Sequence, residues 1–247
     1  SIWALLGRHR ILYALQSPGL TLDISAARIS GSVEPEVDLV ARLGETGALR
    51  ARAAGRADAE AGFDLILHDA AGEAVEPRVG EALSVLAPDA QLMREIEWTV
   101  PRLTLDVDSE AGSIRGSAEP DALVVVRRSE ALGYPGIRSG GLVDGRAFPR
   151  IAPDGAWSVG ETWRRVRGSR TEAQLTLPSG HIAKRTQTDP LLNVQHGGSA
   201  VCGVGQPHRR VTVIARDAVG RPVARAVGRT DADGRFELAL ADDAGRP

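Results

Sequence analysis

Apolar and polar residues alternate in short runs along most of the chain, and turn-forming residues separate these runs. Clear examples cover residues 37–41, 122–126 and 209–213. Alternation with a period of two predicts β-strands that bury one face. The alanine-rich stretch 48–61 is the best helix candidate, but it contains Gly55 and aligns with strand in the other copies, so we expect strand and turn there. The pattern therefore predicts an all-β fold.

A block of the form apolar-x-Gly-x-small-x-Pro precedes each of these three runs, with its glycine at Gly31, Gly116 and Gly203. Gly116 lies 85 residues after Gly31, and Gly203 lies 87 residues after Gly116. This spacing is close to the size of one small β-sandwich domain. We interpret the glycine and the proline as turn residues between two strands. A fixed period of this kind predicts three copies of one module.

A second block repeats further along each copy and places an aromatic residue just after a turn. The aromatic residues are Phe63, Trp157 and Phe236, and we expect them to anchor the cores. An Asp-Gly pair precedes the last two at residues 154–155 and 233–234 and predicts a tight turn. The first copy lacks this pair at residues 59–62, which leaves the conformation of that turn open.

Prolines between apolar strands mark the predicted joints at Pro18, Pro101 and Pro190, because proline fixes φ and cannot donate to a strand ladder. The predicted parts are a closing hairpin over 1–18 that belongs to a preceding domain or to a domain of a neighbouring subunit, an immunoglobulin-like domain over 19–101, a second over 102–190 with a glycine-rich insertion at 130–150, and an incomplete immunoglobulin-like domain over 191–247. The insertion is the first place where we would expect a contact loop.

These repeated blocks resemble the immunoglobulin-like tandem repeats of large secreted or surface-anchored bacterial proteins. The segment from Thr230 to Phe236, which reads Thr-Asp-Ala-Asp-Gly-Arg-Phe, is also similar to the carboxypeptidase regulatory-like β-sandwich. The resemblance covers nearly the whole chain and implies tandem β-sandwich domains with an extracellular or cell-surface location. It is specific for architecture and says little about function, since such sandwiches serve many roles.

Composition narrows the classes of partner. The 247 residues carry a formal net charge of −2, which offers no basic field for nucleic acid. No apolar run approaches the roughly 20 residues of a membrane-spanning helix. The single cysteine, Cys202, cannot form an internal disulfide and lacks the neighbours of a zinc site. We expect it to be a small buried strand residue, and we expect Trp98 and Trp157 to be largely buried.

The sequence motifs that could indicate a metal, nucleotide or glycan site are all weak. The histidines show no metal-ligand spacing, and they are His9, His68, His181, His196 and His208. The Gly203-Val-Gly205 segment lacks the helix that a dinucleotide site needs, and Asp231 to Gly234 fits a tight turn better than a calcium loop. The run 163–167 places a tryptophan among arginines and is the candidate for glycan binding. We expect no enzyme activity, cofactor or metal.

The sequence thus predicts a non-catalytic structural repeat protein of a bacterial surface layer, stalk or filament, with its domains joined end to end. An adhesive or carbohydrate-binding module of a larger protein is the alternative. Residues 2–15 match the closing hairpin of the complete repeats, whereas the third repeat has no such hairpin after its anchor strand. Either the chain is a piece of a longer repeat protein, or residues 2–15 of one subunit complete the third domain of the next.

Overall fold

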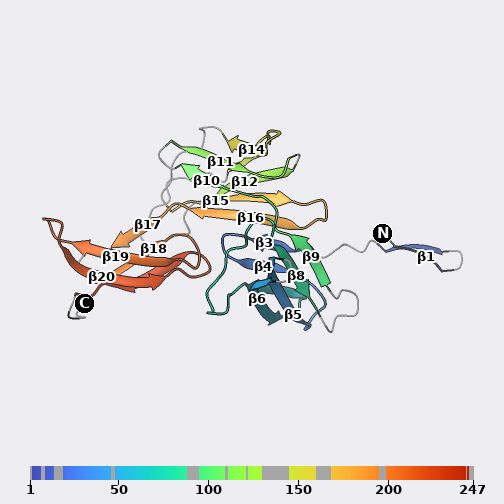
Figure 1. Ribbon diagram of the computed structural model, residues 1–247, viewed down its shortest axis with the longest axis horizontal. Coiled ribbons are helices and arrows are strands. Elements are labelled where there is room, and N and C mark those ends of the chain that lie inside the picture. The colour runs from blue at the N-terminus through green and yellow to red at the C-terminus, as the bar shows by residue number, and fades with distance from the viewer. Residues whose placement is uncertain are drawn as a thin grey trace.

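The computed structural model contains strands and no helix among the residues that it describes (Figure 1). Side chains are described for residues 19–45, 48–87, 95–108, 111–120, 122–129, 145–159, 168–194, 199–242 and 244, and the backbone also for 2–6 and 9–13. No described helix is long and apolar enough to cross a membrane. The all-β prediction is confirmed for these residues.

We refer to residues 19–101, 102–190 and 191–247 as modules 1, 2 and 3. A separate hairpin is formed by β1 (Ile2–Leu6) and β2 (His9–Tyr13). The described strands of module 1 are β3 (Thr21–Asp23), β4 (Arg28–Ser32), β5 (Asp38–Glu45), β6 (Ala48–Arg56), β7 (Gly62–Ile66), β8 (Ala82–Leu86) and β9 (Glu95–Thr99). The stretch 48–61 is strand and turn, as its glycine predicts.

Module 2 repeats this order of strands, and module 3 repeats its first part. The described strands of module 2 are β10 (Asp106–Asp108), β11 (Ser113–Ser117), β12 (Leu123–Ser129), β13 (Gly145–Ala147), β14 (Ala156–Val159), β15 (Arg170–Thr176) and β16 (Ile182–Thr188). Those of module 3 are β17 (Leu191–Val194), β18 (Ala200–Val204), β19 (Arg210–Arg216), β20 (Pro222–Arg229) and β21 (Arg235–Ala239).

Each of the first two modules divides its strands between two groups of hydrogen-bonded neighbours. In module 1 the groups have the orders β3-β4-β7 and β6-β5-β8-β9. Module 2 shows the same orders, β10-β11-β14 and β13-β12-β15-β16. Module 3 shows β17-β18-β21 and a pair, β19-β20. The last two strands of each complete module, β8-β9 and β15-β16, therefore have no counterpart among the described residues of module 3.

Modules 1 and 2 share one sheet. Strand β16 pairs in parallel with β3, with Ile182 opposite Thr21 and Lys184 opposite Asp23. This pair joins the four strands of module 2 to three strands of module 1 in a seven-stranded sheet, so the two modules meet edge to edge (Figure 1). The sequence predicted modules joined end to end, and the structure differs because a first strand pairs laterally with a last strand.

The core of modules 1 and 2 is continuous. Alternate residues of β5, Leu39, Ala41 and Leu43, are buried, as the period-two pattern predicts. They belong to one cluster of buried residues that also contains Val124 of β12 and Leu175 of β15. Fully burying a leucine or valine side chain stabilises a fold by about 1.5–3 kcal/mol. Apolar packing therefore holds the two modules together as well as each one separately.

The repeated glycine makes room for the repeated aromatic residue. Gly116 lies opposite Trp157 in adjacent strands, and the same register pairs Gly31 with Phe63 and Gly203 with Phe236. A Cβ atom at Gly116 would lie 2.3 Å from the Trp157 ring. These glycines are strand residues, not the turn residues that we expected from the sequence. The prediction that the three aromatic side chains are buried is confirmed.

The turn before each aromatic residue has the same backbone in all three modules. Gly155 and Gly234 adopt left-handed φ values of 87° and 81°, and Ala61 adopts 69° at the equivalent position. The equivalence follows from the hydrogen bonds that the three carbonyls accept. The donors are the backbone amides of Val33, Ala118 and Gly205, each two residues after the repeated glycine. Module 1 therefore keeps the turn without its glycine, and Phe63 lies two residues past the turn residue as in the other copies.

Candidate functional site

The joint between modules 1 and 2 contains a buried carboxylate. Asp23 of β3 is almost fully buried, and its Oδ2 lies 3.5 Å from Lys184 Nζ and 3.7 Å from Arg170 Nη2. Both cations come from module 2. A buried charge is costly unless it is paired, so this carboxylate favours the arrangement in which β3 lies beside β16. Asp23 ends a repeated block, Pro18-Gly-Leu-Thr-Leu-Asp23, which recurs at residues 101–106, but the repeat does not indicate that Asp23 pairs with cations of module 2.

Backbone and ring contacts extend this joint. The Ile182 amide donates to the Leu20 carbonyl at 2.8 Å, and the Leu20 amide donates to His181 Nδ1 at 3.3 Å. The His181 ring is buried, 5.0 Å from the Trp98 ring, and burial lowers the pKa of its imidazole. A neutral ring that accepts this hydrogen bond is therefore part of the interface.

Glu76, in the segment between β7 and β8, contacts all three modules. One of its carboxylate oxygens binds Arg185 of β16, and the other lies 2.6 Å from Nη2 of Arg209, just before β19. A second ion pair links Glu73 with Arg229 of module 3. Arg209 and Arg229 are largely exposed, and exposed pairs contribute little stability. These contacts orient module 3 more than they stabilise it.

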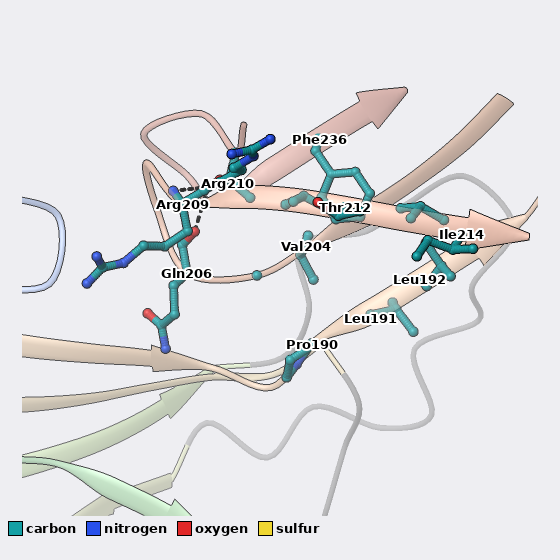
Figure 2. A pocket seen from close by; sticks show the side chains of 14 residues that line it. Pro190, Leu191, Leu192, Val204, Gln206, Arg209, Arg210, Thr212, Ile214 and Phe236 are labelled. Carbon is teal, nitrogen blue, oxygen red and sulfur yellow. Dashed lines mark hydrogen bonds between the residues drawn. The ribbon is translucent and has the colours of Figure 1, made fainter. Parts of the chain in front are cut away.

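Module 3 has an open apolar groove where modules 1 and 2 have packed cores (Figure 2). The groove has a volume of about 740 Å³ and runs between β19 on one side and β17 and β18 on the other. Its apolar lining residues are Pro190, Leu191, Leu192, Val204, Val211, Val213, Ile214 and Phe236. Figure 2 shows Leu192 and Ile214 toward one end of the groove and Arg209 toward the other.

The exposed fractions of equivalent side chains in modules 1 and 3 show how open this core is. Strand register places Leu20 and Leu22 of module 1 at the positions of Leu192 and Val194 in module 3. Leu20 and Leu22 are 1% and 0% exposed, whereas Leu192 and Val194 are 50% and 56% exposed. In module 1, β8 contributes the core residues Leu83 and Val85, and Ile96 and Trp98 of β9 pack against that core. The apolar residues of β17 lack such a cover among the described residues.

Strand β19 also presents an unpaired edge. Within the described part of the chain it pairs only with β20, whereas the equivalent strands β5 and β12 each pair on both sides. The Thr230 amide donates to the Arg209 carbonyl at 2.9 Å. Because hydrogen-bonding direction alternates along a strand, the backbone groups of Thr212 and Ile214 point away from β20. This edge can accept another strand.

The remaining sequence candidates take structural positions or lie outside the described residues. Cys202 lies in β18 but is partly exposed, so the expected burial is only partial. Trp98 is likewise only partly buried. The Asp231 carboxylate accepts hydrogen bonds from the Asp233 and Arg235 amides, as a tight turn requires. The run 163–167 and residues 130–144 of the insertion lie outside the described residues.

Comparison with known proteins gives only distant similarities. No protein-family model and no curated protein matches the chain. A solved structure titled for host cell surface retention of a 1.5-MDa bacterial ice-binding adhesin aligns over 93% of both chains, with 12% identity and a TM-score of 0.23. Trypsin-activated alpha-2-macroglobulin from Escherichia coli aligns over 89% of this chain and 23% of its own, with 10% identity and a TM-score of 0.22. At these TM-scores neither alignment establishes a common fold or role.

Proposed function

We propose that this chain is a non-catalytic structural protein in which immunoglobulin-like β-sandwich modules form a stiff unit of an extracellular or cell-surface assembly in a bacterium. The observation that carries the proposal is the joint between modules 1 and 2. A shared sheet, a continuous core and the buried Asp23 all act at this joint. Flexible linkage is the usual expectation when few contacts cross a boundary, and many contacts cross this one.

The number and pairing order of the strands in modules 1 and 2 support the sandwich assignment. Each has seven described strands in two groups of three and four, with the order of pairing repeated. Seven antiparallel strands in two facing sheets are the number found in small immunoglobulin-like domains. The extracellular and surface location rests on the resemblance of the repeated sequence blocks.

A distance measurement between modules tests the stiffness. Spin labels would be placed at exposed Ala54 in β6 and exposed Ser158 in β14, in a Cys202→Ser background that removes the native thiol. Double electron–electron resonance should give one narrow distance distribution. A broad distribution would show that the modules move independently and would reject a stiff structural unit.

The adhesive alternative needs a separate measurement, because a stiff unit could also carry a binding site. Screening the purified chain on a glycan array addresses it directly. The structural proposal predicts no saturable binding to any glycan. Saturable binding to a defined glycan class would replace it with the adhesive or carbohydrate-binding role.

A further inference from the structure

We propose that the outer face of the β19–β20 ribbon binds an anionic lipid surface and brings module 3 against a membrane. The ribbon covers residues 210–229 and includes the turn between the two strands. Figure 1 shows β19 and β20 side by side on the left of the molecule, away from β5 and β6 of module 1. The inference goes beyond the proposed function, because a structural unit of a cell-surface assembly could have such a contact or lack it.

The register of the two strands defines this outer face. Ala226 of β20 is buried, and a Cβ atom at Gly228 would lie 2.3 Å from the side chain of Leu238. These residues therefore point into the module, and because side chains alternate along a strand, their neighbours point outward. The outward pairs across the ladder are Arg225 with Ile214, Val227 with Thr212, and Arg229 with Arg210. All six of these residues are exposed.

The ribbon is strongly basic although the chain as a whole is not. Six arginines and one acidic residue lie between residues 209 and 229, whereas the chain has a formal net charge of −2. The acidic residue is Asp217, and its Oδ2 lies 2.9 Å from Nε of Arg221. The ribbon therefore carries a local positive charge that the composition of the whole chain conceals.

Two of the outward arginines are free to bind an anion. Arg229 pairs with Glu73 of module 1. Among the described residues, neither Arg210 nor Arg225 has a carboxylate partner. A guanidinium group binds phosphate through two parallel hydrogen bonds. Arg210 and Arg225 can therefore each hold one phosphate group.

Large apolar side chains are exposed among these arginines. Ile214 and Val227 of the outer face are each 45% exposed, and Val223 and Val219 near the turn are 51% and 74% exposed. Single exposed apolar residues are ordinary, but a group of them marks a contact with a protein or a membrane. Apolar side chains combined with arginines are typical of segments that lie at the interface of an anionic membrane.

Module 1 shows that the fold does not require these side chains. Asp38 lies seven residues after Gly31, as Arg210 does after Gly203. The equivalent pairs of module 1 are Asp38 with Arg56, Val40 with Ala54, and Arg42 with Arg52. All except Val40 are exposed although β8 lies beside β5, so this face stays outside the core when a neighbouring strand is present.

The differences between the two faces all favour an anionic and apolar partner. In module 3, Arg210 stands in place of an aspartate, and Ile214 and Val227 stand in place of an arginine and an alanine. Arg210 also lies opposite Arg229, and like charges in directly opposite positions are unfavourable. The face of module 3 therefore has more positive charge and more apolar area than its stability explains.

A nucleic acid fits this face less well than a lipid surface does. The arginines could bind its phosphates, but β19 and β20 contain no aromatic side chain on which a base could stack. The exposed isoleucine and valines would also remain in water. A lipid surface presents phosphate groups with an apolar layer directly beneath them, and it therefore accounts for both features of the face.

Binding of the whole chain to lipid vesicles tests the proposal. Flotation would be measured with vesicles of phosphatidylcholine alone and with vesicles that also contain phosphatidylglycerol. The chain should bind only the vesicles with phosphatidylglycerol, and added salt should weaken this binding because it screens the arginines. Absence of binding to the anionic vesicles, or equal binding to the neutral ones, would overturn the proposal.

A matched pair of double variants locates the cations that bind. Arg210→Gln with Arg225→Gln removes two charges from the outer face and should weaken vesicle binding about tenfold or more. Arg42→Gln with Arg52→Gln removes the same charge from the equivalent face of module 1 and should leave binding unchanged. All four side chains are exposed, so circular dichroism should show that both variants are folded. Equal losses would mean that the vesicles do not select this face, which rejects the proposal.

A second matched pair separates a lipid surface from a dissolved anionic partner. Ile214→Thr with Val227→Thr keeps the charge and the β-branched shape but removes apolar area, and should weaken vesicle binding about tenfold. Leu49→Thr with Leu123→Thr changes two exposed apolar residues of modules 1 and 2 and should leave binding unchanged. If the first variant binds as tightly as the native chain, the face recognises phosphate alone and the lipid surface is wrong.

A fluorescent reporter at the turn of the ribbon detects the contact directly. An environment-sensitive dye would be attached to Val219→Cys in the Cys202→Ser background. Its emission should shift to shorter wavelength with anionic vesicles, because Val219 is the most exposed apolar residue of the ribbon. The same dye at Ala54→Cys in β6 should show no shift. A shift at both positions, or at neither, would contradict docking through this face.

Discussion

At the scale of single residues, the repeated glycine is explained by the aromatic ring opposite it. A Cβ atom at Gly203 would lie 2.5 Å from the Phe236 ring and 2.3 Å from the Leu191 carbonyl oxygen. Two residues away, a Cβ at Gly205 would meet nothing closer than 3.9 Å. The same chemical change therefore has different costs at two neighbouring positions of one module.

Gly203→Ala is expected to destabilise module 3 by about 1–3 kcal/mol, the usual cost of overpacking. Gly205→Ala is the matched control and should change stability by less than about 0.5 kcal/mol. Urea unfolding followed by the circular dichroism of both variants measures the difference. Equal stabilities would show that the glycine is not needed to seat the aromatic ring.

A second residue-scale prediction concerns the turn of module 1. Ala61 adopts a φ of 69°, which is strained for any residue with a Cβ atom. Ala61→Gly should raise the stability of this domain by about 1 kcal/mol. Ala54→Gly, at an exposed strand position of β6, should instead lower it by about 0.5–1 kcal/mol. Thermal unfolding measures both changes. A loss of stability in both variants would contradict a strained backbone at Ala61.

At the scale of elements, the parallel pair of β3 and β16 depends on Asp23. Replacing Asp23 with Asn removes the buried anion that Lys184 and Arg170 share, and because these two cations keep contact with water the loss should cost about 1–3 kcal/mol. Asp64→Asn is the control, because Asp64 pairs with Arg28 at an exposed site where pairs contribute about 0–1 kcal/mol. Chemical unfolding should show a large loss only for Asp23→Asn. Similar losses in the two variants would refute a special role for the joint.

At the scale of the whole molecule, His181 should make the joint sensitive to acid. Burial lowers the pKa of its imidazole in the folded chain, so the unfolded chain binds the proton more readily below the ordinary histidine value of about 6.5. Its contribution to stability is therefore full above about pH 6.5 and declines as the pH falls below that value.

The measurement is the free energy of unfolding between pH 7.5 and pH 5 for the native chain and His181→Gln. A glutamine oxygen can still accept from the Leu20 amide but does not titrate in this range. The variant should lose less stability on acidification than the native chain. Identical slopes would mean that other groups, such as His208 with its similarly lowered pKa, account for the whole effect.

The sequence by itself determined the all-β class and the burial of the three aromatic residues, and it predicted three copies of one module, because each of these depends on short-range alternation and on turn residues at fixed spacing. It also indicated the unmatched hairpin over residues 2–15. Only the tertiary structure decided that β3 lies beside β16, that Glu76 contacts three modules, and that the repeated glycines lie opposite aromatic rings. Contacts between residues such as Asp23 and Lys184, far apart in the chain, leave no periodic trace, since either side chain alone is an ordinary charged residue of a strand.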